Sequence, residues 1–150
     1  MLIRPMTQLD LPGVLAVASS GFGRADAQLA QPDFNDMFSA AAWRPFFYVA
    51  VNRADERIVG VAGYAVSWLN YGVYELFWVG VLEEFRGSGA GKALVSRCLV
   101  DLATIADQVI LATDIPDFYA KNWKFAVMGS LQTTSGSNDV LMIKDMRSGS

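Results

Sequence analysis

Residues 86–91 have the residue types and the spacing of a phosphate-binding loop. They read Arg86-Gly87-Ser88-Gly89-Ala90-Gly91. Glycines let successive backbone N–H groups turn toward one anion, and a helix that begins directly after the loop adds partial positive charge. The planar guanidinium of Arg86 suits paired hydrogen bonds to phosphate oxygens. Together these features predict a site for a diphosphate.

The flanking sequence predicts the elements that position this loop. Residues 74–81 are rich in aromatic and β-branched side chains, which favours a β-strand. Residues 92–106 carry apolar side chains at helical spacing. Two common nucleotide-binding loops fit poorly. A P-loop would place Ser or Thr where Ala93 stands, and a dinucleotide-binding turn would follow the first strand of its fold rather than begin at residue 86.

The composition excludes several kinds of chemistry. The chain has no histidine and one cysteine, so it has no Ser-His-Asp triad, no Cys-His pair and no zinc site. Proton transfer must therefore use carboxylates, tyrosines, lysines, water or the backbone. We expect no metal, and we expect Cys98 to be a buried core thiol because it lies on the apolar side of its helix.

Length and charge indicate the class of protein. The chain has 150 residues, of which 53% are hydrophobic and 18% charged, as in one compact domain. We expect a cytoplasmic protein, because there is one cysteine, no secretion signal and no apolar run long enough to span a membrane. A net charge of −3 disfavours nucleic acid as a partner. The mean hydropathy of +0.28 is compatible with a homodimer.

Apolar periodicity and the positions of Gly and Pro predict the order of the elements. Thr7 and Asp10 have the spacing of a helix N-cap and its acidic partner, so we expect a helix from there to about Ser20, ending near Gly21 and Gly23. Further helices are expected at 33–43 and from Pro116. The strand at 109–112 should run parallel to 74–81, because a helix connects them. The expected strands are 2–4, 46–51, 58–68, 74–81, 109–112, 125–131 and 140–143.

The loop and its surroundings resemble the GNAT superfamily of acyl-CoA N-acyltransferases. The acetyl-CoA-binding signature of that family is Arg or Gln, two residues, Gly, one residue, then Gly or Ala, and Arg86, Gly89 and Gly91 satisfy it. The preceding strand ends at Val81, five residues ahead of Arg86, as in the family. The opening Ile3-Arg4-Pro5-Met6, followed by an amphipathic helix, is also similar. The resemblance covers nearly the whole chain.

The resemblance implies a single α/β domain over residues 1–146, followed by a frayed tail at 147–150. The GNAT-like fold would be a central mixed sheet of about six to seven strands with helices on both faces. The cofactor would lie where the fourth and fifth strands diverge.

The resemblance also implies two catalytic residues. Glu75 lies six residues before Val81, where several GNAT enzymes carry a catalytic glutamate, and burial in an apolar strand would raise its pKa toward that of a useful base. Phe118-Tyr119 begins the helix after the fifth strand, similar to the late tyrosine of the family, which assists the departing thiolate. Alternatively, Glu75 points to solvent or pairs with an arginine, and Tyr119 only packs against the cofactor. The Gly-Phe pair of the family is absent from residues 121–125, so we expect a different helix exit.

Alternation along residues 74–81 predicts two apolar faces. One face would carry Glu75, Phe77, Val79 and Val81, and the other Tyr74, Leu76 and Trp78. A glutamate buried between such faces would be costly and would need a functional reason.

The implied cofactor is acetyl-CoA. Diverging strands would leave N–H groups near Val79 and Val81 free for the pantetheine amides and the thioester oxygen. The glycine loop would hold the pyrophosphate, while Lys92 either helps or is a solvated surface lysine. The implied cofactor-binding residues are Val79, Gly80, Val81, Arg86, Gly87, Ser88, Gly89, Ala90, Gly91, Lys92, Phe118 and Tyr119.

The acceptor pocket is expected between residues 22–43 and 68–74, where aromatic and acidic side chains would suit a cationic amine with an apolar body. Alternatively, most of these aromatics belong to the core and the acids to helix surfaces. The residues are Phe22, Phe34, Phe38, Trp43, Trp68, Tyr71, Tyr74, Asp26, Asp33 and Asp36.

These features predict an N-acetyltransferase that moves an acetyl group from acetyl-CoA to a primary amine of a small molecule or a protein by direct attack. One alternative is a CoA-binding sensor or interaction module without turnover. A nucleotide hydrolase is a third hypothesis, which the missing P-loop hydroxyl disfavours.

Overall fold

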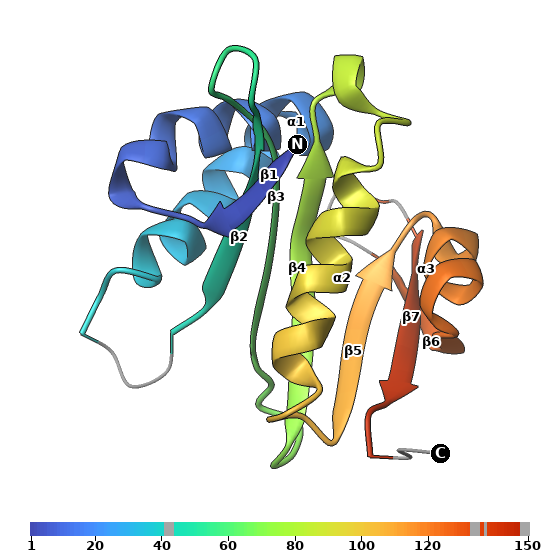
Figure 1. Ribbon diagram of the computed structural model, residues 1–150. Helices are drawn as coiled ribbons and strands as arrows, with labels where there is room; N and C mark the ends of the chain where they lie inside the picture. Colours follow the sequence, from blue (N-terminus) through green and yellow to red (C-terminus); the bar gives the residue numbers. More distant parts are fainter. Residues whose placement is uncertain (41–43, 133–135, 137, 148–150) are drawn as a thin grey trace.

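A computed structural model describes residues 1–150 except 41–43, 133–135, 137 and 148–150, and also leaves out the side chains of 23–25. Seven strands form one mixed sheet in the order β1-β2-β3-β4-β5-β7-β6 (Figure 1). All neighbours are antiparallel except β4 and β5, which are parallel, as the sequence predicts. The strands are β1 (Leu2–Pro5), β2 (Phe46–Asn52), β3 (Arg57–Val66), β4 (Val73–Val81), β5 (Gln108–Thr113), β6 (Ala126–Gln132) and β7 (Asn138–Asp145).

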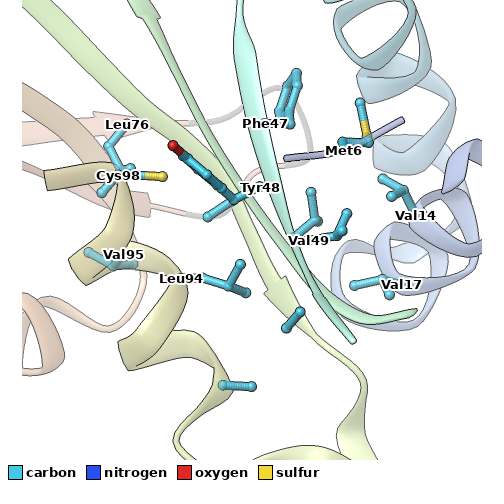
Figure 2. Close-up of a cluster of buried hydrophobic side chains, with 14 of the residues drawn as sticks. Met6, Val14, Val17, Phe47, Tyr48, Val49, Leu76, Leu94, Val95 and Cys98 are labelled. Atoms are coloured by element: carbon cyan, nitrogen blue, oxygen red, sulfur yellow. The ribbon is translucent and has the colours of Figure 1, made fainter. Parts of the chain in front are cut away.

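Helices cover both faces of this sheet, and the expected GNAT-like arrangement is thereby confirmed. Helix α1 (Leu11–Asp36) packs on one face and α2 (Ala90–Leu102) on the other (Figures 1 and 2). Helix α3 (Pro116–Trp123) lies beside α2. The two helices are joined by a hydrogen bond from the Trp123 indole to Ser96 Oγ at 3.2 Å. In the described part of the chain, no helix has the length and apolarity to cross a bilayer.

The prediction of two separate N-terminal helices is wrong. Gly21 and Gly23 do not end the first helix, which continues through them and through Pro32 to Asp36. Figure 1 shows that α1 changes direction along its course, and glycines are common where helices bend. Burial of Val14, Val17, Ala27, Ala30 and Phe34 against the sheet outweighs the low helix propensity of the glycines. The end of the expected 33–43 helix lies partly outside the described residues.

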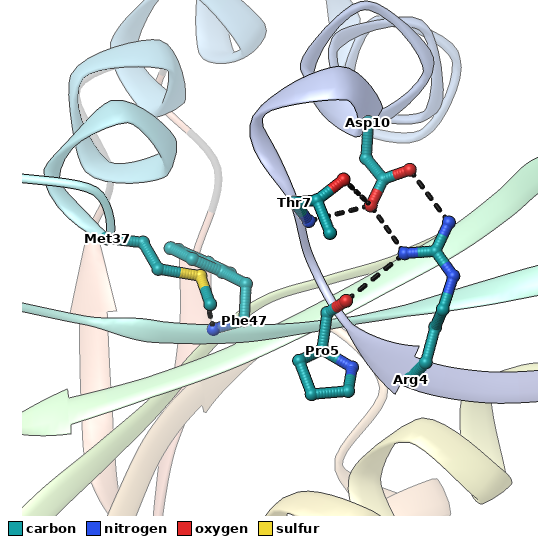
Figure 3. Close-up of polar contacts among 6 residues, drawn as sticks. All are labelled: Arg4, Pro5, Thr7, Asp10, Met37 and Phe47. Atoms are coloured by element: carbon teal, nitrogen blue, oxygen red, sulfur yellow. Dashed lines mark hydrogen bonds and ion pairs between the residues drawn. The ribbon is translucent and has the colours of Figure 1, made fainter.

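A half-buried ion pair connects the start of α1 to β1. Both oxygens of Asp10 accept hydrogen bonds from Arg4, at 2.6 and 2.9 Å, and one of them also accepts the Thr7 backbone N–H at 2.7 Å (Figure 3). The expected pairing of Thr7 with Asp10 is thereby confirmed. Asp10 lies in the short helix η1 (Gln8–Asp10) and is only 7% exposed. The Arg4 hydrogen bonds lower the pKa of Asp10, outweighing the effect of its burial.

The core fills the space between the sheet and its two covering helices. Figure 2 shows Val14 and Val17 of α1 on one side of the sheet, and Leu94, Val95 and Cys98 of α2 on the other. All five side chains are fully buried. Burial raises the pKa of the Cys98 thiol, which keeps it protonated and inert as expected. The core therefore fixes β3 and β4 between two layers of helix.

The fourth and fifth strands separate beyond the middle of the sheet. Their ladder has three pairs, which run from Val73↔Gln108 to Glu75↔Ile110. Beyond that point β5 pairs only with β7, while β4 continues beside β3 to Val81. The predicted divergence of these strands is therefore present, and it opens the sheet directly after Glu75.

The carboxyl-terminal hairpin forms as predicted, with β6 antiparallel to β7 at the edge of the sheet. Most of the connecting turn lies outside the described residues, as do residues 148–150 of the expected frayed tail. Arg147 is described and forms an exposed ion pair with Asp145.

Candidate functional site

A cleft of about 1350 Å³ occupies the gap between β4 and β5. It brings together residues of α1, β4, the glycine loop, the first turn of α2, the end of β5 and α3. Both predicted catalytic residues line it, and so do all the predicted cofactor-binding residues except Ser88. Chain segments that are up to about a hundred residues apart therefore meet at one concave surface, as in most small-molecule sites.

Glu75 is exposed in this cleft, so the prediction that it is buried between two apolar faces is wrong. The cause is the divergence of the strands, which begins at the Glu75↔Ile110 pair and leaves open space beside the carboxylate. Surrounding protein atoms still remove part of its hydration, and this burial, followed by the negative charge of Asp33, raises the pKa of Glu75. No ion pair in the described part of the chain includes Glu75.

A β-bulge interrupts β4 after Phe77 and overturns the predicted alternation. Val61 pairs with Gly80 and Gly63 with Phe77, so Trp78 and Val79 together face one β3 residue. Trp78 has the left-handed φ of 49° and packs against Phe22 of α1, with ring centroids 5.3 Å apart.

The bulge changes which side of the sheet the following side chains of β4 face. A Cβ on Gly80 would lie 2.8 Å from the Phe22 ring, so Gly80 faces α1. A Cβ on Gly91 of α2 would instead lie 3.6 Å from Val81. Phe77 contacts Phe47, which packs on Phe34 of α1. Phe77 and Trp78 therefore face α1 together, whereas Val81 faces α2.

The open edge of β4 carries backbone donors. The Leu82 N–H donates to Val59 O of β3 at 2.9 Å. Since successive N–H groups of a strand point to opposite sides, the Gly80 N–H also faces β3. Those of Val79 and Val81 then face the cleft, where β5 has turned away. This edge matches the requirement for donors to amide and thioester oxygens.

The glycine loop enters α2 with the backbone conformation that an anion cradle needs. Gly87 and Gly89 have φ values of 81° and 87°, and a Cβ at either position would meet no atom within 4 Å. Glycine is therefore favoured at both positions because of the left-handed backbone, and not because a side chain would clash. Helix α2 begins at Ala90, two residues earlier than predicted, and the N–H groups of Gly91 and Lys92 lie in its first turn without an intrahelical acceptor.

Three side chains complete the loop. Arg86 is exposed, lines the cleft and belongs to none of the ion pairs among the described residues. Lys92 is also exposed and lines the cleft. Ser88 instead acts within the loop, because its Oγ accepts the Ala90 N–H at 3.3 Å. The cationic end of the cleft thus lies at the start of α2.

Tyr119 and Phe118 form the opposite wall of the cleft, from α3. Tyr119 is only 5% exposed and contacts the rings of Phe118, Trp123 and Phe125. Burial, followed by the negative charge of Asp114, raises its pKa, so the phenol keeps its proton at neutral pH.

Helix α3 ends without the glycine of the family pattern, as expected from residues 121–125. Lys124 ends α3 with a left-handed φ of 62°, the conformation that glycine usually supplies at this position. The Lys144 ammonium donates to the Trp123 carbonyl at 2.7 Å, which adds positive charge at the carboxyl end of the helix.

The predicted acceptor residues divide into two groups. Phe22, Asp26, Asp33 and Asp36 of α1 line the cleft, and the charge of Asp33 contributes to the raised pKa of Glu75. The other predicted aromatics that the structure describes do not line it. Phe34 and Phe38 pack in or against the core, Tyr74 contacts Tyr64, Trp68 and Tyr71 are exposed near the β3–β4 connection, and Trp43 lies outside the described residues.

Several lining residues have no counterpart in the sequence prediction. Thr113, Asp114 and Ile115 follow the carboxyl end of β5, where the rule that ligands bind at the carboxyl ends of parallel strands could have found them. Asp139 reaches the cleft through the pairing of β5 with β7, for which the local sequence contains no signal.

Comparisons with known proteins agree with this geometry. An acetyltransferase of the GNAT family from Desulfovibrio desulfuricans shares 23% identity over 97% of this chain and 98% of its own, with a TM-score of 0.81. An aminoglycoside 6'-N-acetyltransferase solved with coenzyme A shares 15% identity over 97% of each chain, with a TM-score of 0.77. For the ribosomal-protein-alanine N-acetyltransferase of Brucella melitensis the identity is 20%, over 97% of this chain and 99% of its own, and the TM-score is 0.74.

At these identities the likeness is one of fold. No curated protein sequence matches the chain. The family itself is shown by a sequence-family model, described as the acetyltransferase (GNAT) family, which matches residues 13–124. The chain therefore belongs to the acetyltransferase (GNAT) family, as an acetyltransferase whose acetyl donor is acetyl-CoA.

Proposed function

We propose that this acetyltransferase transfers the acetyl group to a primary amine by direct attack, with no covalent intermediate on the protein. The observation that carries the proposal is the cleft itself, where Glu75, the open edge of β4 and the glycine loop face one space. The acceptor is the amine of a small molecule or of a protein. Acetyl-CoA supplies the acetyl group as a thioester, so no nucleophilic side chain is needed.

The residues of the cleft fit such a cofactor. The Val79 and Val81 N–H groups, on the edge of β4 that β5 has left, would bind the pantetheine amides and the thioester oxygen, with Gly80 between them. The left-handed Gly87 and Gly89 would aim further N–H groups at the pyrophosphate.

Other groups would complete cofactor binding. Arg86 and Lys92 add positive charge beside the first turn of α2. Ser88 braces the loop through Ala90, and Phe118 packs against the pantetheine arm.

Glu75 is the proposed general base. A primary amine has a pKa near 10.4 and must lose a proton to attack. Burial and the charge of Asp33 raise the pKa of Glu75, which brings it closer to the pKa of a useful base. Its exposure to the cleft leaves room for a water between the carboxylate and the amine. We therefore propose proton removal either directly or through one water.

Tyr119 is the proposed partner of the departing thiolate. Its raised pKa lies above that of a thiol, near 8.5, so full proton transfer from the phenol is uphill. A hydrogen bond from the phenol to the sulfur is favourable all the same, because it stabilises the developing negative charge. In this proposal Tyr119 acts mainly as a positioned donor.

The acceptor end of the cleft favours a cationic substrate. Asp26, Asp33 and Asp36 of α1 line the cleft with Glu75, and the charge of Asp33 acts on the Glu75 carboxylate. Among the described side chains, Arg86 and Lys92 are the cations that line the cleft, and they belong to the glycine loop and the start of α2. An ammonium group is therefore attracted to the Glu75 end before it loses its proton.

Compartment and assembly are part of the proposal. A single buried thiol suits the reducing cytoplasm. All seven residues of the edge strand β6 are exposed, among them Val127, Met128 and Leu131, and an exposed apolar edge strand is normally covered. We therefore expect a homodimer, which light scattering of the purified protein would detect as a doubled mass.

The test is thiol release from acetyl-CoA in the presence of a panel of primary amines, with the acetylated product identified by mass spectrometry. Glu75→Gln should abolish most of the release at neutral pH, whereas Glu83→Gln, on the exposed turn η2 (Glu83–Phe85), should not. A protein that binds acetyl-CoA but releases no thiol with any amine would instead be the CoA-binding module.

A further inference from the structure

Trp78 has an unusual backbone conformation for its position. In the described part of the chain, three residues other than glycine have a left-handed φ, namely Glu56, Trp78 and Lys124. Glu56 lies in the turn before β3 and Lys124 at the end of α3, where this conformation is common. Trp78 is instead inside a strand, and left-handed backbone in a bulky residue persists only where its surroundings enforce it.

The surroundings that enforce it come from α1. The Trp78 indole N–H donates to Asp33 Oδ2 at 2.8 Å. Phe22 meets the indole edge-on, and Phe34 lies against it with ring centroids 6.5 Å apart. The Trp78 indole is therefore held by one hydrogen bond to Asp33 and by packing against two phenylalanines.

The bulge at Trp78 decides where the following amides point. Because β4 has one extra residue there, Gly80 lies under Phe22, and the N–H groups of Val79 and Val81 face the open side of the strand. A β4 without the bulge would shift this register by one residue and turn both amides toward β3. The carboxylate that accepts the Trp78 indole bond lies 45 residues away in the sequence.

We propose that Asp33 is a positioning residue of this acetyltransferase: by accepting the Trp78 indole hydrogen bond, its carboxylate holds the β4 bulge that presents the Val79 and Val81 amides to the acyl end of the cofactor. This inference rests on the proposed function of those two amides. It assigns Asp33 a role that acts through Trp78, apart from any contact with the acceptor amine.

The test combines nuclear magnetic resonance with coenzyme A binding in the full-length protein. The Trp78 indole resonance is assigned by its loss in Trp78→Phe, which keeps an aromatic ring but removes the donor. We expect Asp33→Ala to move this resonance toward the position of a solvent-exposed indole, to weaken coenzyme A binding measured by calorimetry, and to lower kcat by roughly tenfold or more. Asp33→Asn, whose amide oxygen still accepts the bond, should restore coenzyme A affinity.

Two comparisons make the test specific. Asn35→Ala, an exposed position of α1 outside the cleft, should change none of these readouts. Asp33→Ala and Trp78→Phe combined should cost no more than either alone, because they break the same bond. If Asp33→Ala does not fold, Trp78→Phe tests the same bond by itself.

The proposal is overturned if Asp33→Ala leaves the indole resonance and coenzyme A affinity unchanged, even if the KM for the acceptor rises. Failure of the proposed function would look different. The wild-type protein would then release no thiol with any amine, although Asp33→Ala would still move the indole resonance and weaken coenzyme A binding.

Discussion

Replacing Glu75 by Gln removes the proposed base while it keeps the size and polarity of the side chain. Without a base, only the fraction of amine that is already neutral can attack, and this fraction is about 1 in 2,500 at pH 7 for a pKa near 10.4. General bases typically contribute about 10²–10⁴ in rate. We therefore expect kcat/KM of Glu75→Gln to fall by about 10²–10³ at pH 7.

The loss of kcat/KM in Glu75→Gln should become smaller as the pH rises. The neutral fraction of the amine rises about hundredfold between pH 7 and pH 9, so most of the defect should disappear at the higher pH. In the wild type, Glu75 works only when ionised. Because burial and Asp33 raise its pKa above the ordinary 4.5, wild-type activity should be lost as the pH falls through that raised value. Glu75→Gln should lack this acid limb.

The assay is thiol release at saturating acetyl-CoA, measured across the pH range for the wild type, Glu75→Gln and Glu83→Gln. Coenzyme A affinity should be nearly equal in all three, since neither Glu75 nor Glu83 is among the residues proposed to bind the cofactor. Full activity of Glu75→Gln at pH 7, or a defect of constant size from pH 7 to pH 9, would refute the assignment of Glu75 as the base.

Four further predictions concern other parts of the structure. Asp33→Asn removes a negative charge near Glu75, so the acid limb of kcat/KM should move to lower pH; an unchanged limb would mean that burial alone sets the pKa of Glu75. Gly89→Ala puts a Cβ on a residue with φ of 87°, a strain of about 1–2 kcal/mol, and should weaken coenzyme A binding roughly tenfold in calorimetry, whereas Glu83→Gln should not. Asp10→Asn removes the charge of the half-buried pair with Arg4 and should destabilise the protein by about 1–3 kcal/mol in urea unfolding. Since the pKa of Asp10 is lowered in the folded state, that difference should be present at neutral pH and vanish as the pH falls through the folded-state value. Lys124→Gly relieves left-handed strain and should raise Tm by about 2–4 °C, and an unchanged or lower Tm would show that the Lys124 side chain offsets this strain.

The part of the site that the sequence predicts is the part that local rules determine. Glycines after an apolar strand and before a helix specify the loop at 86–91, and the helix that follows makes β5 parallel to β4. Glu75 is found because a single charge interrupts an apolar strand. These features depend on residues close together in the chain.

Other features come from contacts across the fold. The bulge at Trp78 opposes the local preference of a tryptophan and is held by Asp33 and Phe22 of α1, so alternation along β4 cannot predict it. The exposure of Glu75 follows from the divergence of β5, which strand propensities do not contain. The continuity of α1 through Gly21 likewise depends on burial of its apolar residues against the sheet.

A titration of the backbone amide resonances with coenzyme A shows whether the edge of β4 and the glycine loop hold the cofactor. We expect the amides of Val79, Val81, Gly89 and Gly91 to shift most and to saturate together as coenzyme A is added. The proposed cofactor site is wrong if these amides stay in place while coenzyme A binds, or if the largest shifts occur at the distant β3–β4 connection around Asn70.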